Sequence, residues 1–360
     1  MSHTHYLTDA QADAFGRELD AIRDEIKASL GESDAAYIRR MIRIQRGLDI
    51  GGRALLFAGV LPPAWLAGTA MLSIAKILEN MEVGHNVMHA QWDWMKDPKI
   101  HSTTWEWDTA CPSDQWKHSH NYMHHTYTNV VGMDRDVGYG ILRMSPQQPW
   151  RPWNLGQPVY NALLAGLFQY GVALHDVEFE RVLEGKKTWR DAWARLKAIG
   201  RKTGRQTLKD YVLFPLLSGP FFLYVFSGNL VANFVRNLWA YTIIFCGHFP
   251  SGSHTFSESS VENESRGRWY LRQLLGSCNI KGGKVFHILS GNLSHQIEHH
   301  LFPDLPSNRY AEIAPRVQAL CEQYGLPYNT GSLARQFGTT TWRVLRLSLP
   351  GGQSLEPQLA

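Results

Sequence analysis

Apolar residues recur every three or four positions along the first 47 residues, and this spacing predicts two amphipathic helices. The first runs from Thr8, a favourable N-cap, to Gly31, and the second begins near Ser33. The second combines its apolar stripe with four arginines, Arg39, Arg40, Arg43 and Arg46. Such a helix either lies on anionic lipid or presents a solvated face, and this stretch leaves both interpretations open.

Two apolar hairpins follow, each with two legs. The legs cover residues 48–61, 63–83, 211–226 and 230–249. The first hairpin breaks at Pro62 and the second at residues 227–229. Each leg is close to, or shorter than, the roughly 20 residues with which a helix crosses a bilayer. Three cations, Arg53, Lys76 and Arg236, lie inside the legs, so buried helices of a soluble protein are the alternative.

The distribution of charge favours a membrane protein. The breaks between the legs are short and uncharged, whereas nearly all lysines and arginines lie outside the hairpins. By the positive-inside rule, both chain ends and residues 90–210 are then cytoplasmic. The pattern predicts an all-α integral membrane protein with four transmembrane helices in two hairpins.

The remaining segments complete the predicted organisation. Residues 1–47 are the cytoplasmic N-terminal helices, residues 48–325 form the main domain, and residues 326–360 form a loosely ordered tail with a short amphipathic piece at 342–347. The apolar run at 160–174 is predicted to be an interfacial or buried helix that does not cross the membrane. The first 20 residues are polar and partly acidic, which does not fit a secretory signal.

Composition narrows the class of protein. Charged residues make up 19% of the 360 residues and aromatic residues 12%, which excludes intrinsic disorder. A net charge of +4 gives no argument for nucleic-acid binding. The four cysteines contain no Cys-x-x-Cys pair, which excludes disulfide scaffolds, zinc ribbons and ferredoxin-type clusters.

Histidine is the unusual component, with 16 residues that fall largely into tight groups. His85 and His89 are four residues apart, so a helix would place them on one face. The second group has His120 and His124 at the same spacing, followed by His125, about 100° away around a helix. One face could therefore serve one metal ion while the adjacent residue reaches another.

The third group repeats this arithmetic, with His295 and His299 on one face and His300 offset. With His118, the three groups hold more imidazoles than one zinc ion accepts, so two metal ions are implied. Imidazole suits zinc, copper, iron and nickel, so ligand type does not identify the element. Residues available to accept the free ring N–H groups are Asp134, Asp136, Asn292, Gln296 and Glu298.

Outside the three groups, His248 is a further ligand candidate, because the second and fourth legs end on the same side of the membrane. His287 remains possible, as it stands eight residues before His295. The other histidines have no partners in register and are given structural roles: His3, His5, His101, His175 and His254.

The three groups read HNVMH, HNYMHH and HQIEHH, and they resemble the histidine boxes of the membrane fatty acid desaturase family. The flanking segments at 88–94, 125–132 and 291–306 resemble its bacterial acyl-CoA 9-desaturases. The likeness extends over about residues 50–320. It implies a four-helix membrane stalk under a cytoplasmic cap that holds a di-iron centre, in the bacterial cytoplasmic membrane with the active site on the cytoplasmic side.

This resemblance implies O2-dependent insertion of a cis double bond, at carbon 9, into a saturated long-chain acyl-CoA during unsaturated fatty acid biosynthesis. An unactivated C–H bond offers no acidic proton and no electrophile, so the chemistry needs a redox metal. A dry tunnel should hold the acyl chain. Trp92, Trp94 and Trp116 are candidates for its lining, and a membrane-interface belt is the alternative.

Two features depart from the usual family pattern. Gln296 occupies the position of the first histidine of the third box, with His295 just before it, and the sequence leaves open which of them binds metal. The chain has no His-Pro-Gly-Gly motif of a fused cytochrome b5, no glycine-rich nucleotide fingerprint and no cysteine cluster. Electrons are therefore expected from a separate NAD(P)H-dependent reductase, directly or through a ferredoxin- or rubredoxin-type carrier.

Three other functions compete with a desaturase. A hydroxylase, ketolase or alkane monooxygenase could use the same arrangement of histidine ligands, because all these reactions begin by removing a hydrogen atom from the substrate. A histidine-rich metal transporter would place its ligands near the middle of the membrane rather than beyond the helix ends. A soluble zinc hydrolase lacks the H-E-x-x-H pattern here and would leave several imidazoles unused.

Overall fold

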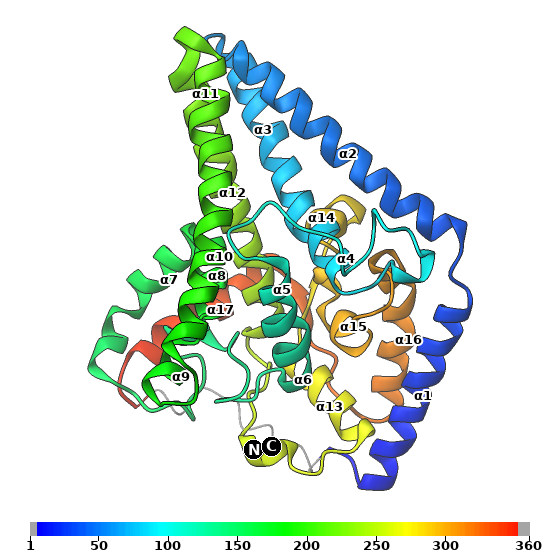
Figure 1. Cartoon of the computed structure of the whole chain (residues 1–360). Coiled ribbons are helices and arrows are strands. Elements are labelled where there is room, and N and C mark those ends of the chain that lie inside the picture. Colours follow the sequence, from blue (N-terminus) through cyan, green and yellow to red (C-terminus); the bar gives the residue numbers. More distant parts are fainter. Residues whose placement is uncertain (1–5, 352–360) are drawn as a thin grey trace.

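The computed structural model describes residues 6–351, so His3, His5 and residues 352–360 lie outside the described part of the chain. Helices dominate, and the described residues contain two strands of three residues each. Figure 1 shows long helices that meet at a narrow tip and a broad helical body at the other end. The all-α prediction is confirmed.

The first hairpin consists of α2 (Glu32–Phe57) and α3 (Pro62–Leu78). Pro62 is the first residue of α3. Proline suits this position, because the backbone N–H that it lacks would have no hydrogen-bond partner in the first turn of a helix. The two helices cross closely at glycine: a Cβ on Gly52 would lie 2.9 Å from the carbonyl oxygen of Gly68. The second N-terminal helix and most of the first apolar leg form one continuous helix, because residues 48–57 extend it without a break.

The second hairpin rises through α10 (Trp189–Thr207), a π-helical turn (Leu208–Leu213) and α11 (Phe214–Leu217) and returns through α12 (Phe222–His248). The chain reverses at residues 218–221, where Gly219 has a φ of +58°. The predicted break at 227–229 is wrong, because these residues lie inside α12. A Cβ on Gly228 would lie 2.5 Å from a methyl carbon of Leu56, so this glycine permits close packing instead of a turn.

A buried polar cluster joins the two hairpins. The carboxylate of Asp210 is fully buried and pairs with Arg53 Nη2 at 3.1 Å and with Lys76 Nζ at 2.7 Å. Asn233 of α12 adds a hydrogen bond to the same carboxylate at 3.2 Å. Because an unpaired charge at this depth would be strongly destabilising, these contacts fix the relative positions of four helices. The cations inside the apolar legs are explained by this carboxylate.

One helix of the described residues, Gly219–His248, is long and apolar enough to cross a membrane by length and composition. The exposed face of its first half carries large apolar side chains, including Leu223 and Leu230.

The broad body contains the histidine groups. Its largest core is formed by α1 (Asp9–Ala28), α13 (Arg266–Gly276), α15 (Gln296–Leu301) and α16 (Tyr310–Gln323). The first two helices are in close contact, since a Cβ on Gly267 would lie 2.0 Å from the carbonyl oxygen of Ala12. The amphipathic helix predicted from Thr8 is therefore part of the core: Phe15 and Leu19 are fully buried.

Shorter elements surround this core. They are α4 (Asn86–Met88), α5 (Ser113–Trp116), α6 (His125–Tyr127), α7 (Gln157–Gly166), α8 (Phe168–His175), α9 (Phe179–Leu183) and α14 (Lys284–Leu289). The apolar run at 160–174 is thus divided between two short helices, α7 and α8. Strands β1 (Asn279–Lys281) and β2 (Thr330–Ser332) pair in parallel.

The C-terminal region is more ordered than expected. Residues 333–348 form one helix, α17 (Leu333–Ser348), in place of the predicted loose tail with a short helical piece. The hydroxyl of Ser332 accepts a hydrogen bond from the backbone N–H of Arg335 and caps the helix. The side chain of Gln336 donates to the carbonyl oxygen of Asn279 at 3.0 Å, which attaches α17 to the body.

Candidate metal centre

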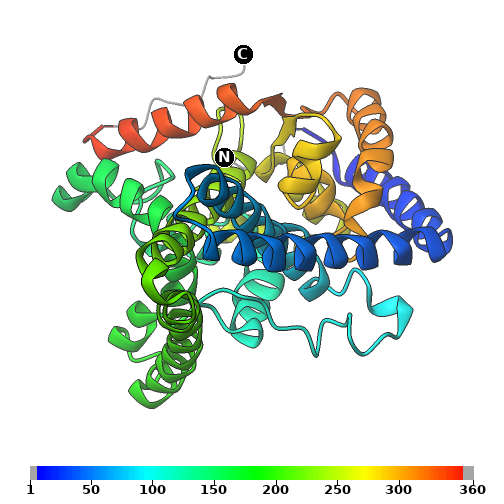
Figure 2. The same cartoon turned by 90° about the horizontal axis from the view of Figure 1, so that it is seen from above.

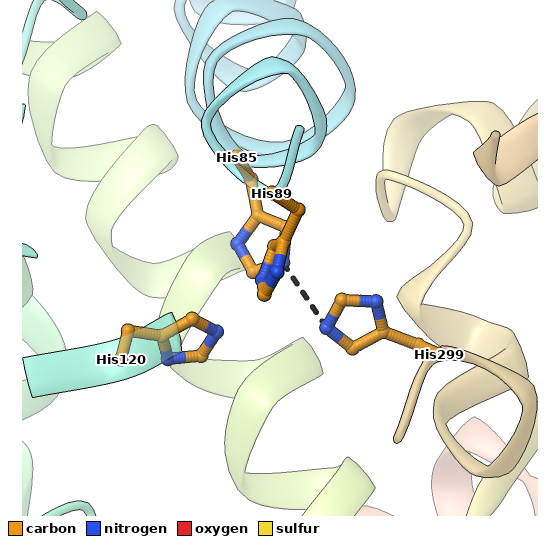
Figure 3. A group of neighbouring side chains, drawn as sticks. All are labelled: His85, His89, His120 and His299. Carbon is orange, nitrogen blue, oxygen red and sulfur yellow. Dashed lines mark hydrogen bonds between the residues drawn. The ribbon is translucent and has the colours of Figure 1, made fainter. Parts of the chain in front are cut away.

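Four histidines from three separate segments meet in the first group (Figure 3). The members are His85, His89, His120 and His299, which we call group A. Each offers a ring nitrogen within 4.8 Å of the others, and all four side chains are buried. The Nε2 atoms of His85 and His299 are only 3.3 Å apart. Nitrogens this close suit ligands that surround a common metal ion.

Three further buried histidines form the second group, group B: His124, His248 and His300. His248 is the last residue of α12, so the end of the apolar helix delivers it directly to the body. Its Nε2 atom lies 3.2 Å from Nε2 of His300. The side-chain nitrogen of Gln296 lies 3.0 Å from the same atom of His248.

His120 belongs to group A and His124 to group B, and the two also form a third set of potential ligands with Asp136. Their rings stack, with centroids 5.0 Å apart, although both residues lie in a π-helical turn, Lys117–His124. That they serve the same metal ion stays a prediction. A second π-helical turn, Glu79–His85, ends at His85.

Two carboxylates orient the rings of the second sequence box. His124 Nδ1 lies 2.9 Å from Asp134, and His120 Nδ1 lies 3.3 Å from Asp136. The second contact also explains why His120, His124 and Asp136 form a compact set of potential ligands. We interpret Asp136 as an orienting group, because it faces the nitrogens that point away from groups A and B.

His175 was expected to have no partner and instead contacts the same carboxylate. Its Nε2 atom lies 3.0 Å from Asp136, and its Nδ1 lies 2.7 Å from the carbonyl oxygen of Val172. Burial is the largest single influence and lowers the pKa of His175, but the hydrogen bond and the charge of Asp136, with the hydrogen bond to Val172, together raise it overall. Sequence spacing missed this residue, because it comes from α8, about 40 positions from Asp136.

The rings of the third box have uncharged partners. His299 Nδ1 lies 3.3 Å from the hydroxyl of Tyr310. His300 Nδ1 lies 3.0 Å from the side-chain oxygen of Gln273 and 3.2 Å from the hydroxyl of Thr128. None of these three partners was a sequence candidate, and no local motif indicates them, since they lie on other elements.

His295 does not join His299. Its backbone has φ −100° and ψ 56°, so the α-helix begins only at Gln296 and the assumed helical spacing does not apply. Its ring stacks on His287, with ring centroids 4.6 Å apart. Gln296, rather than His295, reaches group B, and its side-chain oxygen is buried without a hydrogen-bond partner.

Two other residues expected to accept a ring N–H, Asn292 and Glu298, do not contact the rings of groups A and B. Asn292 donates to Glu82 at 2.9 Å and not to a ligand ring. Glu298 accepts hydrogen bonds from Tyr328 at 2.7 Å and from Asn279 at 2.8 Å. Burial raises the pKa of Glu298 to about 7, and these hydrogen bonds offset part of the increase. Both residues hold the scaffold of the centre.

Two histidines of the second box lie outside groups A and B. His125 lies between them: its ring stacks on His300, with centroids 4.4 Å apart, and lies 4.6 Å from the ring of His89. Neither ring nitrogen of His125 has a hydrogen-bond partner. His118 is exposed and stacks on Tyr122, which gives it no contact with either group.

The donor set fits metal ions. Buried Nε2 atoms without a partner occur at His89, His120, His124 and His125, although buried polar atoms are normally hydrogen-bonded. Burial lowers the pKa of six rings well below the usual value, and neighbouring rings lower it further: His85, His89, His125, His248, His299 and His300. Neutral imidazole is the form that binds metal.

The comparison with known families agrees with this chemistry. A model of the fatty acid desaturase family matches residues 61–332. The chain belongs to the fatty acid desaturase family. It is 50% identical over 350 residues to the NADPH-dependent stearoyl-CoA 9-desaturase of Mycobacterium tuberculosis, a match that covers 96% of this chain and 82% of that protein. The sn-1 linoleoyl-lipid 6-desaturase of Synechocystis sp. is 26% identical over 322 residues, 87% of this chain and 88% of that protein.

A small, partly enclosed cavity adjoins group A. Its wall includes His85, His120 and Trp116, and the ring of Trp116 stacks on His120 with centroids 4.5 Å apart. Helices α8 and α12 also line the cavity, with apolar Phe168, Val172 and Ile244 and polar Gln169, His175 and Asn237. Of the three tryptophans expected to line a tunnel, Trp116 lines this cavity. Trp107, which was not among the three, also lines it.

The other two tryptophans of that prediction lie elsewhere in the desaturase. Trp92 is fully buried and stacks on Tyr37, with ring centroids 6.3 Å apart. Trp94 donates a hydrogen bond from its indole nitrogen to the carbonyl oxygen of Gln91. Both belong to the packing between α2 and the segment after the first histidine box.

Proposed function

We propose that this chain is an O2-dependent acyl desaturase that introduces a cis double bond at carbon 9 of a saturated long-chain acyl-CoA for unsaturated fatty acid biosynthesis. The observation that carries the proposal is the partly apolar cavity beside two adjoining sets of buried imidazoles. The 50% identical relative, named as a stearoyl-CoA 9-desaturase, supports the substrate class and the double-bond position.

The ligand assignment follows the two groups. His85, His89, His120 and His299 would hold one iron ion, and His124, His248 and His300 the other. His125, with two unpartnered ring nitrogens, and the free amide oxygen of Gln296 are available to complete these shells. When bound, the iron pair supplies the redox chemistry with which O2 removes hydrogen from unactivated methylene carbons. His295 is not part of this assignment.

The protein's own residues position and shield the acyl chain. Because His85, His120 and Trp116 share the cavity wall with aliphatic and aromatic side chains, a methylene pair held there lies against group A in a largely apolar environment. Such an environment keeps water from the reacting carbons. Asp134 and Asp136 hold the rings of His124 and His120 through Nδ1, so that Nε2 of each ring faces the centre.

We place the two hairpins in a bacterial cytoplasmic membrane as four crossing helices, with the body and the metal centre on the cytoplasmic side. The apolar helix that ends at His248 supports this arrangement, because it connects the hairpin tip to the metal centre. Electrons would come from a separate NAD(P)H-dependent reductase, directly or through a ferredoxin- or rubredoxin-type carrier. The relative is named as an NADPH-dependent enzyme, which supports a nicotinamide nucleotide as the source of these electrons.

Expression in a desaturase-deficient bacterial host tests this function. We expect monounsaturated acyl chains in the lipid extract by mass spectrometry and two iron ions per purified polypeptide. His124→Ala should lose both the product and iron, whereas His118→Ala, a matched change in the same π-helical turn but outside both groups, should retain them. A hydroxylated product would identify a monooxygenase instead. A single ion or a redox-inert metal would contradict the proposed centre.

A further inference from the structure

The C-terminal helix α17 exposes large apolar side chains. Its buried face mixes polar Gln336 and Thr340 with apolar Val344 and Leu347, all at most 3% exposed. Its outer face presents Phe337, Trp342 and Leu345, followed by Leu349 just beyond the helix, and Trp342 is 59% exposed. A helix at the surface of a soluble body normally buries its apolar side chains and exposes its polar ones. This arrangement indicates that the medium outside α17 is itself apolar.

A neighbouring helix extends the same kind of surface. α7 contacts α17 and is held to it by Gln157, whose side-chain nitrogen donates to the carbonyl oxygen of Val344 at 2.9 Å. Trp150, just before α7, donates to the carbonyl oxygen of Ser348 at 2.9 Å. The segment that leads into α7 and the helix itself expose large apolar side chains, namely Trp153, Leu155, Val159, Tyr160 and Leu163.

This surface is continuous with the apolar helix α12. A Cβ on Gly166, at the end of α7, would lie 3.0 Å from the ring of Phe234, which is itself half exposed on α12. On the same helix, Leu230 and Leu238 are exposed at spacings of four residues on either side of Phe234. In Figure 1, α7 and α17 run across the direction of α12, and Figure 2 shows α17 along one edge of the molecule.

Charge identifies the kind of partner. Residues 137–175, which include α7, and residues 331–351, which include α17, contain no aspartate or glutamate. Together they carry five arginines, of which Arg151 and Arg335 are exposed and Arg346 is partly exposed. The other two face the protein: Arg143 is buried, and Arg343 donates to the carbonyl oxygens of Pro250 and Ser253. Tryptophan and tyrosine beside arginine are typical of the border between lipid and water, and arginine is attracted to anionic headgroups.

We propose that α17, with α7, lies in the cytoplasmic leaflet as an interfacial element that contacts acyl chains through Phe337, Trp342 and Leu345 and anionic headgroups through Arg335 and Arg346. The inference rests on the proposed membrane location of the hairpins and adds a contact beyond the four crossing helices. The helix thereby fixes the depth of the body, and with it the height of the metal centre, relative to the membrane surface. Crosswise helices with one apolar and one polar side adopt this position on bilayers.

A fluorescent label on the full chain in nanodiscs tests the contact. All four native cysteines are buried, so a new surface cysteine can be labelled selectively with an environment-sensitive dye. Leu345→Cys places the label on the outer face of α17, Glu322→Cys places it on the exposed polar side of α16, and Leu230→Cys places it on α12. Quenching is measured with phospholipids that carry a nitroxide on the acyl chain.

We expect the label at 345 to be blue-shifted and quenched nearly as strongly as at 230, and the label at 322 to remain unquenched. Replacing phosphatidylglycerol by phosphatidylcholine, or introducing Arg335→Gln with Arg346→Gln, should weaken the quenching at 345 and leave that at 230 unchanged. Quenching at 230 without quenching at 345 would overturn this inference while leaving the membrane hairpins intact. No quenching at 230 would overturn the membrane location itself.

A blue shift at 345 without nitroxide quenching would indicate a protein partner, such as a second copy of the chain, and would also overturn the lipid contact. Iron content of each labelled variant is measured in parallel. Because none of the three positions belongs to groups A and B, we expect the iron content to remain at the wild-type value, which shows that the label reports on a folded protein.

Discussion

The rings of His120 and His124 meet carboxylates on the side away from the metal centre, whereas the rings of His299 and His300 meet a phenol, an amide and a hydroxyl. One side of the centre is therefore anionic and the other neutral. A carboxylate makes its imidazole a more basic ligand than a neutral partner does. We infer that the anionic side would offset part of the positive charge of bound ions, while the neutral side chiefly sets ring orientation.

The largest effect should come from removing a ring on the neutral side. His299→Ala leaves group A with three of its four histidines and should abolish activity and reduce bound iron by more than the roughly 10–100-fold that loss of an outer partner costs. His295→Ala is the matched control, because its ring stacks on His287 outside both groups. Iron analysis decides between them. Equal iron loss in both variants would show that His295 is a ligand after all.

A carboxylate on the neutral side should behave differently from those on the anionic side. Glu298 is fully buried without a cation, and burial raises its pKa from 4.5 to about 7. The folded state therefore holds a proton that the unfolded state releases, so this stabilisation is complete below pH 4.5 and is lost as the pH rises to about 7. The loss is on the order of 3 kcal/mol.

Glu298→Gln removes this titration. We expect the difference in melting temperature, variant minus wild type, to increase steadily between pH 4.5 and 7. Thermal unfolding followed across this range measures the difference. A constant offset between the two proteins at every pH would contradict the assignment of the titration to Glu298.

On the anionic side, Asp136→Asn should weaken metal binding about 10–100-fold, because it leaves the imidazole of His120 without its carboxylate. The metal affinity is measured by competition with a chelator. His175→Gln perturbs the same carboxylate indirectly and should have a smaller effect. If His175→Gln weakened binding more than Asp136→Asn, His175 would have a direct role in the centre.

The smallest effect should come from a neutral partner. Tyr310→Phe removes the hydroxyl that lies 3.3 Å from Nδ1 of His299. A neutral hydrogen bond contributes about 1 kcal/mol, which corresponds to a roughly fivefold change in affinity. The same chelator competition measures it. A loss as large as that of Asp136→Asn would remove the distinction between the two sides of the centre.

The sequence predicted which residues make up the centre better than it predicted how these residues are arranged in space. Repeated spacings among histidines marked His85, His89, His120, His124, His299 and His300, and the matching ends of two apolar legs marked His248. Helical spacing then failed where the backbone is not α-helical. The non-helical backbone of His295 separates it from His299. His120 and His124, by contrast, still stack within their π-helical turn.

Long-range contacts explain the other differences. Gly228 looked like a turn residue because nothing local reveals that Leu56 packs against it. Residues 333–348 looked like a tail because the outward-facing Phe337 and Trp342 obscure the amphipathic pattern of a body helix. In both places the partner of the segment decides its structure, and that partner is distant in sequence.

For this protein, the sequence alone determined the helical fold class, the pool of imidazole ligands and the family chemistry, because these depend on residue type and short-range spacing. The tertiary structure decided which histidines face each other, which carboxylates and hydroxyls orient them, and where the cavity lies. These features depend on backbone turns and on contacts between elements that are far apart along the chain, such as α8 with Asp136 and α16 with His299. Local sequence patterns do not indicate such contacts, so only the tertiary structure reveals them.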